Sequence, residues 1–364
     1  MLLAVLIVAV ALLAWANGAN DNFKGVATLY GSGALGYRTA LGWATAATLA
    51  GSALSLAIAG GLQARFAGNG ILPQELEASL PALASIALAG AATILLASRL
   101  GLPTSTTHAL TGALLGVALA AGTPWSALAP MGRLFALPLV LGPLVAIALA
   151  WPAAWLAKRA AERPGPSADP CACLVSVEPA PAQGASLSAV ATPLLVFGRR
   201  ADCERDLPGA PALTARSAAH AMHVLSAGTV CFARAVNDTP KIATLLLAVP
   251  ATSRWGGLGL VAVAMAAGGW LGARRVAETM SRRITAIPQG QGFLANAVTA
   301  ALVLAASPLG LPLSTTHVSC GSIFGIALAR RSAERRTVAT ILGAWLTTLP
   351  LGALIAYASY AALA

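Results

Sequence analysis

The sequence predicts an all-α polytopic membrane protein made of two inverted repeats. Hydrophobic residues make up 57% of the 364 positions and charged residues only 10%, whereas a soluble domain carries about a quarter charged residues. Long stretches without a charge, such as 39–62 and 134–157, are each sufficient to span a bilayer of roughly 30 Å as a helix. Two different motifs also occur twice, in the same order.

The repeated motifs show that the chain is a duplication. Asn-Asp-x-x-Lys occupies 20–24 and 237–241, and Leu-Gly-Leu-Pro-x-Ser-Thr-Thr-His occupies 100–108 and 309–317. Such ordered self-similarity is the signature of a structural repeat. We therefore expect a first transmembrane repeat at 1–157 and a second at 217–364.

A central insert separates the repeats. Between 158 and 216 the long apolar stretches stop, and Arg, Glu, Asp, Pro and Cys become frequent. The run at 190–197 is β-like but too short to span a bilayer. We interpret 158–216 as a cytoplasmic loop or small extramembrane insert.

Each repeat is expected to contain a broken first helix, full spans and a re-entrant helical hairpin. The first-half segments are 2–35, 39–62, 81–99 with 103–121, and 131–157. Their counterparts are 217–250, 256–273, 288–307 with 312–329, and 337–361. If the two short pieces that meet at Gly-Leu-Pro re-enter from one side, each half crosses three times. An odd number of crossings makes the second copy inverted.

The basic residues support this topology. With both termini outside, 16 basic residues lie inside and only Arg65, Arg133 and Arg254 lie outside. This matches the positive-inside rule, so the net charge of +11 does not indicate a nucleic-acid partner. We expect a multi-pass protein of the cell inner membrane, with the lipid bilayer around it.

Ionisable residues within the spans mark the candidate site. Of twelve acidic residues, only Asp21 and Asp238 fall in spans, and Lys24 and Lys241 follow three positions later, on the same helix face. These pairs could be purely structural ion pairs. Their equivalent places in both repeats favour one shared site near the bilayer midplane.

The second motif predicts an anion site. Pro ends the first hairpin piece, and Ser and Thr are preferred at the start of a helix, where free N–H groups attract anions. Two such helix ends would form a donor-rich pocket suited to a tetrahedral oxyanion, although ordinary capping is the alternative. The hydroxyl residues are Ser105, Thr106, Thr107, Ser314, Thr315 and Thr316.

Other polar residues leave alternatives open. His108 and His317 lie about one turn into the second pieces of the two hairpins. They could be structural residues or could relay protons. Arg234 replaces Asn17 in the second copy and could contact an anion, a phospholipid or Asp238. Cys171, Cys173 and the distant Cys203 lack an obvious fourth metal ligand, so we predict no metal site.

Both motifs resemble those of the inorganic phosphate transporter (PiT) family. Gly-Ala-Asn-Asp at 18–21 is similar to the start of the family's repeated signature, and Leu-Pro-x-Ser-Thr-Thr-His to its second motif. The resemblance implies secondary active phosphate uptake coupled to Na⁺ or H⁺, and often a homodimer. It also implies that the Ser-Thr-Thr triplets line the substrate and ion sites together with Asn20, Asp21, Asn237 and Asp238.

One departure concerns the coupling ion. The family pattern has Asn where this chain has Lys24 and Lys241. An ammonium group only donates hydrogen bonds and repels Na⁺, so our hypothesis is that each lysine takes the place of a coupling Na⁺. Transport would then be H⁺-coupled or uncoupled, and sulfate becomes an alternative substrate.

Three function classes were weighed on these residues. The expected function is a secondary inorganic-anion permease working by alternating access, with phosphate first. An anion channel is an alternative, and a membrane-embedded enzyme using Asp21, Asp238 and the histidines is disfavoured because alternating access, unlike catalysis, benefits from duplication. No phosphate-cradling loop for ATP is present, so the chain does not resemble an ATPase subunit. We expect a protein that is not an enzyme and has no cofactor.

Overall fold

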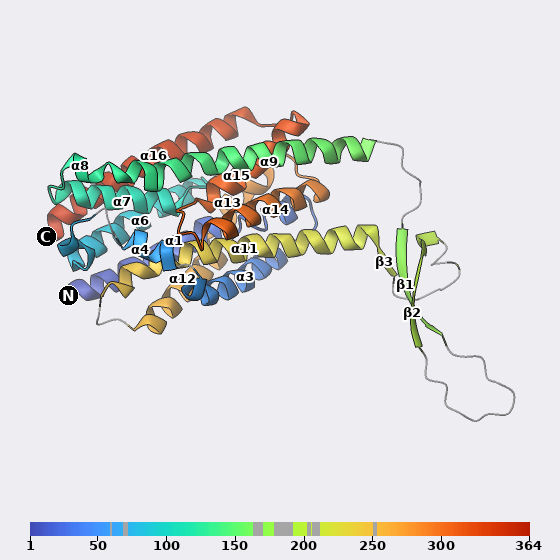
Figure 1. Cartoon of the computed structure of the whole chain (residues 1–364), viewed down its shortest axis with the longest axis horizontal. Coiled ribbons are helices and arrows are strands. Elements are labelled where there is room, and N and C mark those ends of the chain that lie inside the picture. Colours follow the sequence, from blue (N-terminus) through green and yellow to red (C-terminus); the bar gives the residue numbers. More distant parts are fainter. Residues whose placement is uncertain are drawn as a thin grey trace, which may run out of the picture.

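The computed structural model describes residues 1–58, 60–67, 72–162, 170–177, 192–201, 205, 212–249 and 253–364. Most of the described residues form an elongated bundle of helices, from one end of which a small β-structured insert projects (Figure 1). Both chain termini lie at the opposite end of the bundle (Figure 1).

The helices follow the expected order in both halves. The first half contains α1 (Leu2–Asp21), α2 (Ala27–Gly31), α3 (Tyr37–Ile58), α4 (Gly60–Phe66), α5 (Gln74–Glu77), α6 (Leu80–Leu100), α7 (Thr106–Ala120), α8 (Trp125–Leu128), a π-helical turn (Gly132–Ala136) and α9 (Leu137–Glu162). The second half contains α11 (Ala215–Leu247), α12 (Arg254–Gly272), α13 (Arg274–Glu278), a π-helical turn (Thr279–Arg283), α14 (Gln289–Ala306), α15 (Thr315–Arg330) and α16 (Arg335–Leu363).

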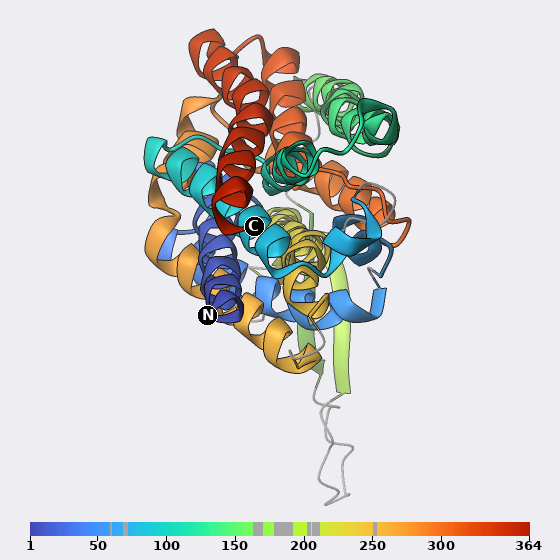
Figure 2. The same cartoon turned by 90° about the vertical axis from the view of Figure 1, so that its left-hand side faces the viewer.

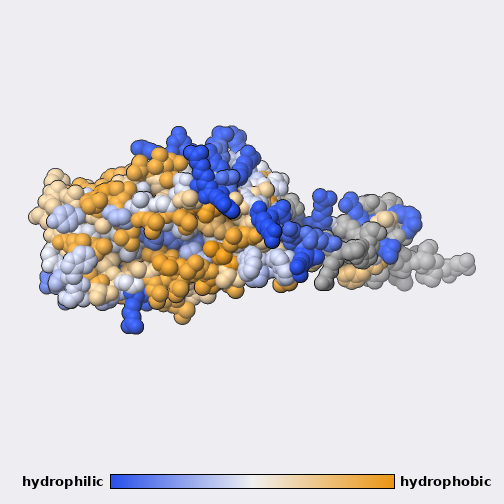
Figure 3. Space-filling model, turned by 90° about the horizontal axis from the view of Figure 1, so that it is seen from above, coloured by the Kyte–Doolittle hydropathy of each residue, from blue (hydrophilic) through white to orange (hydrophobic). Residues whose placement is uncertain are grey.

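Several helices can cross a membrane by length and composition. Within the described residues there are five, which are Leu2–Asp21, Leu80–Leu100, Trp125–Ala160, Trp255–Gly272 and Arg335–Leu363. Hydrophobic residues cover much of the bundle's flank in Figure 3, and hydrophilic residues gather where the bundle meets the insert. The structure is therefore that of a multi-pass membrane protein, with α7 too short to span alone.

Equivalent helices of the two halves pack on equivalent partners in the other half. Helix α1 packs on α12 as α11 packs on α3, and α7 packs on α16 as α15 packs on α9. The pair α1 and α6 likewise matches the pair α11 and α14. Figure 2, which looks along the bundle, shows blue-to-green first-half helices interleaved with yellow-to-red second-half helices.

Equivalent helices run in opposite directions along the bundle. In Figure 1, α1 starts at the end that carries the termini, whereas α11 starts at the insert and runs back towards that end. Similarly, α9 runs towards the insert and α16 runs away from it (Figure 1).

Glycines allow close contacts between the halves. A Cβ atom on Gly112 or Gly116 of α7 would lie 2.1 Å from a backbone oxygen of α16. The equivalent Gly321 and Gly325 of α15 approach α9 in the same way, with nearest distances of 2.7 Å and 2.9 Å. Small residues four apart let membrane helices pack backbone to backbone, so this spacing explains two of the main contacts between the halves.

The expected break in the first helix occurs in only one half. In the first half, α1 ends at Asp21 and α2 begins at Ala27. In the second half, α11 continues as one helix of 33 residues with Pro240 inside it, so the prediction of a broken helix at 217–250 is wrong. The first copy has one residue more between its Lys and its Ala-Thr-Leu sequence, and an extra residue rotates a helix face by about 100° unless a turn absorbs it.

The described part of the insert contains β-strands, which corrects the expectation of an all-α chain. A three-stranded antiparallel sheet of order β2-β1-β3 is built from β1 (Pro170–Val177), β2 (Thr192–Arg199) and β3 (Ala212–Thr214). The β-like run at 190–197 overlaps β2. On β1, the sulfur atoms of Cys171 and Cys173 lie 3.3 Å apart, whereas Cys203 lies outside the described residues.

Candidate functional site

The Gly-Leu-Pro-x-Ser-Thr-Thr-His motifs form the expected helix breaks. Helix α6 ends at Gly101, whose φ of 71° is left-handed, and Gly310 after α14 has a φ of 65°. Glycine adopts this conformation at no steric cost and commonly ends helices. Ser105 and Ser314 then cap α7 and α15, because their hydroxyls accept hydrogen bonds from the backbone N–H groups of the motif histidines. The chain therefore turns at the same motif position in both halves.

Lys24 lies buried at one of these turns. Its Nζ forms a short ion pair with Asp21, and only 2% of the lysine is exposed. It also donates to the Thr104 carbonyl at 2.8 Å and to the Thr316 hydroxyl at 2.5 Å. Thr104 belongs to the first half and Thr316 to the second, so Lys24 connects the two breaks.

Lys241 repeats this arrangement from the other half. Its Nζ lies 3.3 Å from Asp238 and 3.3 Å from the Leu313 carbonyl, and it donates to the Thr107 hydroxyl at 2.8 Å. Lys241 is fully buried, with its ammonium 5.6 Å from the centre of the Phe66 ring. Each lysine thus contacts its own aspartate, its own turn, and a threonine of the opposite half.

Asn17 connects the two aspartates. Its Nδ2 donates to Asp21 at 3.0 Å, to Thr106 at 2.8 Å and, more weakly, to Asp238 at 3.3 Å. Its Oδ1 accepts a hydrogen bond of 2.9 Å from Arg234. The sequence analysis had not assigned Asn17 to the site, because only its position opposite Arg234 in the repeat had been noted.

Arg234 stabilises the first motif from the second half. Besides Asn17, its guanidinium donates to Thr48 at 2.8 Å and to Asn22 at 3.4 Å. Among the described residues it makes no ion pair with Asp238, which was one of the three expected alternatives. Arg234 is fully buried, and a buried cation requires compensating partners.

The ionic centre carries one net positive charge. Three cationic and two anionic side chains, each at most 2% exposed, lie within it, and these are Lys24, Arg234, Lys241, Asp21 and Asp238. A buried centre with an excess positive charge and several hydroxyl donors favours an anion.

Asn20 holds the first turn in place. Its Nδ2 donates to the Ser98 hydroxyl at 3.0 Å and to the Leu102 carbonyl at 3.0 Å. Its Oδ1 accepts the Thr104 N–H at 3.1 Å. All of these partners flank the helix break, so Asn20 positions the turn that also contacts Lys24.

Asn237 does the same in the second half. It donates to the Leu313 carbonyl at 3.0 Å and to the Thr315 hydroxyl at 3.4 Å, and it accepts from Ser307 at 3.5 Å. Ser98 and Ser307 occupy equivalent places, five residues before the motif proline. The site predicted from the sequence includes neither serine. Their equal distance from the repeated proline is the signal that indicates them.

The two motif histidines meet although they lie in different halves. The His108 and His317 rings are 4.4 Å apart in an edge-to-face contact, and the Trp345 ring lies 3.8 Å from His317. His317 Nδ1 lies 3.2 Å from the Leu139 carbonyl, and Trp345 donates to the Pro103 carbonyl at 3.1 Å. The histidines are therefore adjacent to the turns that form the centre.

A bundle of apolar helices around a buried, cationic, hydroxyl-rich centre, built from two copies of one motif pair, defines a polytopic membrane transporter. Residues 17–356 match the family described as "Phosphate transporter family", and the chain belongs to that family.

Named relatives cover nearly the whole chain. "Inorganic phosphate transporter 2-1, chloroplastic" of Arabidopsis thaliana is 30% identical, over 94% of this chain and 69% of that protein. "Probable low-affinity inorganic phosphate transporter" of Mycobacterium bovis is 28% identical, over 99% of this chain and 77% of that protein. These findings support phosphate permease function, and proteins of this family are transporters rather than enzymes.

A solved structure shares the fold. The structure described as "The sodium-dependent phosphate transporter" superposes with a TM-score of 0.73 at 20% sequence identity, covering 100% of this chain and 98% of that one. At this level of identity the likeness concerns the fold alone.

Proposed function

We propose that the chain carries phosphate by alternating access through one central site to which both halves contribute. The main support for this proposal is that a lysine of each half donates a hydrogen bond to a threonine of the other half. Lys24 donates to Thr316 at 2.5 Å, and Lys241 donates to the equivalent Thr107 at 2.8 Å. A single site shared by two repeats is the usual basis of alternating access.

In this proposal, bound phosphate takes the place of hydrogen bonds that residues of the ionic centre make with one another. The anion would take hydrogen bonds from the two lysines and from the hydroxyls and N–H groups at the starts of α7 and α15. The residues proposed to bind or frame it are Asn20, Asp21, Lys24, Ser105, Thr106, Thr107, Asn237, Asp238, Lys241, Ser314, Thr315 and Thr316. We add Asn17 and Arg234, which contact the same groups.

The membrane arrangement is part of the proposal. We infer two inverted repeats at 1–157 and 217–364, each with a re-entrant hairpin, in the cell inner membrane. The termini would lie outside and the insert at 158–216 in the cytoplasm. The opposite directions of α1 and α11 and the exchangeable packing of the halves support the inversion. The resemblance also implies a homodimer.

We further propose that Lys24 and Lys241 serve as fixed cations where a coupling Na⁺ would otherwise bind. The solved relative is described as sodium-dependent. In this chain, each motif aspartate already pairs with a buried lysine three residues later, and a second cation there would be repelled. Transport would then be driven by H⁺ or run without a coupling ion, and the contact of His108 with His317 supports a relay at this place.

Uptake of labelled phosphate into proteoliposomes tests the proposal. Uptake is expected without a Na⁺ gradient, with arsenate and sulfate as competitors to define the anion. Strict Na⁺ dependence would contradict the role of the lysines, and flux that does not saturate would indicate a channel. Asp21→Asn and Lys24→Asn are run beside the wild type. If neither variant alters uptake, the site assignment is wrong.

A further inference from the structure

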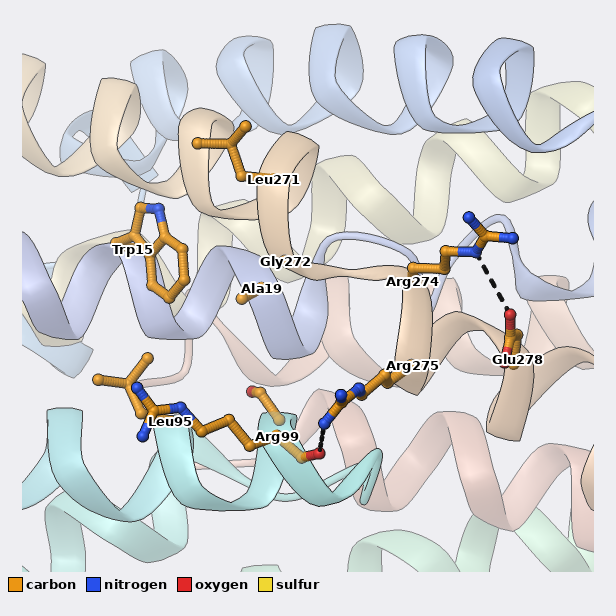
Figure 4. A pocket seen from close by; sticks show the side chains of 10 residues that line it. Trp15, Ala19, Leu95, Arg99, Leu271, Gly272, Arg274, Arg275 and Glu278 are labelled. Carbon is orange, nitrogen blue, oxygen red and sulfur yellow. Dashed lines mark hydrogen bonds and ion pairs between the residues drawn. The ribbon is translucent and has the colours of Figure 1, made fainter.

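A cavity lined by cationic residues lies outside the ionic centre. It has a volume of about 720 Å³ and lies between α1, α6, α12 and α13 (Figure 4). The lining residues that matter here are Ser98, Arg99, Leu271, Arg274, Arg275 and Glu278. Three arginines and one glutamate give this pocket a formal charge of +2.

The guanidinium of Arg99 is directed into the apolar part of the pocket. Long side chains on a helix point back towards its N-terminus, and Figure 4 shows the Arg99 side chain running back along α6 to Leu95. No hydrogen bond or ion pair engages this guanidinium among the described residues. Arg99 is exposed, so its unpaired guanidinium is accessible to an anion that enters the pocket.

The other two arginines are held in place. Arg275 donates a short hydrogen bond to the Arg99 carbonyl, which anchors α13 to the end of α6. Arg274 lies 3.4 Å from Glu278, as Figure 4 shows. The pocket therefore combines the unpaired guanidinium of Arg99 with that of Arg275, which is anchored to α6, and that of Arg274, which is in an exposed ion pair.

The floor of the pocket contacts the ionic centre. Ser98 lines the pocket and accepts a hydrogen bond of 3.0 Å from Asn20, which positions the first turn. The other side is apolar and faces outward, since Leu271 is 75% exposed. The pocket thus has a basic end, an apolar lip and a serine that is hydrogen-bonded to Asn20.

We propose that this pocket binds a phosphate group through Arg99, with Arg274 and Arg275 around it. Arginine pairs with phosphate through two parallel hydrogen bonds. The phosphate group belongs either to free phosphate on its way between the centre and the insert side, or to the headgroup of an anionic phospholipid whose chain lies on Leu271. The first source rests on the proposed function, and the second does not.

Two arms of one experiment test the pocket with matched variants. Arg99→Gln and Arg275→Gln remove pocket charge, and Arg335→Gln removes an exposed charge at the start of α16, outside the pocket. In vesicles of neutral lipid, the KM for phosphate is measured separately on each side. Arg99→Gln should raise the KM on the insert side by about threefold to tenfold, as expected for a contact partly screened by salt, with Arg335→Gln unchanged.

The second arm measures lipid. Purified protein in detergent is titrated with phosphatidylglycerol, and bound lipid is counted by native mass spectrometry. A lipid site predicts one bound molecule that Arg99→Gln loses and Arg335→Gln keeps. A response in either arm supports the phosphate-group site and names its source. If both pocket variants match Arg335→Gln in both arms, the inference is overturned. If the wild type carries no phosphate, the proposed function fails, while the lipid arm still decides the pocket.

Discussion

Arg234 and Asn17 occupy the same position in the two motif copies, and they bond directly to each other, with 2.9 Å between Arg234 Nη1 and Asn17 Oδ1. Equivalent residues meet in this way only near the axis that relates two repeats. Because one is cationic and the other neutral, the duplicated centre has a single excess positive charge at its middle.

This relationship predicts the effect of removing that charge. Arg234→Gln should raise the KM for phosphate by about tenfold or more, since a hydrogen-bonded charge contributes about 1.5–3 kcal/mol. Arg234→Lys keeps the charge without the planar fork and should give an intermediate value. Initial uptake rates over a range of phosphate concentrations provide the measurement. An unchanged KM in Arg234→Gln would exclude this charge from anion binding.

The hydrogen bonds between a lysine of each half and a threonine of the other half predict that two distant substitutions have similar effects on transport. Thr107→Val and Thr316→Val each leave one buried lysine without a hydroxyl partner, which costs about 1–3 kcal/mol. Both should lower kcat/KM for phosphate to a similar extent. Thr347→Val is the control, because Thr347 is exposed and bonds only within α16. If one of these two variants were as active as the wild type and the other inactive, a site shared by both halves would be contradicted.

The buried ion pairs predict a specific pattern of stability. Lys24→Met leaves Asp21 charged and buried, which costs about 3–5 kcal/mol. The double variant Lys24→Met with Asp21→Asn removes both charges and should recover most of that loss. Thermal unfolding in detergent gives the Tm of each variant. Equal Tm values for the single and double variants would show that the pair is not coupled.

The close contact of α7 with α16 predicts a difference between two glycines. A Cβ at position 116 would lie 2.1 Å from the Ala353 oxygen, so Gly116→Ala should destabilise the fold by about 1–3 kcal/mol. Gly259 in α12 has open space around it, and Gly259→Ala should stabilise its helix by up to about 1 kcal/mol. The two Tm values should therefore move in opposite directions. A shared direction would argue against backbone contact between α7 and α16.

Local chemistry explains what the sequence predicted correctly. The turns at Gly101 and Gly310 and the caps at Ser105 and Ser314 depend on neighbouring residues alone. The ends of α6, α7, α14 and α15 therefore lie close to the expected 81–99, 103–121, 288–307 and 312–329.

Tertiary structure explains what was missed. A break was expected within 217–250, yet α11 stays helical through Pro240, and only the first copy carries an extra residue. The bonds from Lys24 to Thr316 and from Asn17 to Asp238 join residues more than 200 positions apart. No local pattern indicates such pairs, although the duplication identified the residues that could form them.

The packing of the helices has a consequence for movement. The two repeats are not separate bodies, because each packs closely on helices of the other. Helix α7 packs on α16, α9 on α15, α1 on α12 and α3 on α11. Any rocking motion that opens the centre must move one mixed group of helices against another. Helices α1, α3, α11 and α12 form one such connected group. The pair α7 and α16 packs on α6, and the pair α9 and α15 packs on α14. In the proposed alternating access, the moving parts would thus differ from the two duplicated units of the sequence.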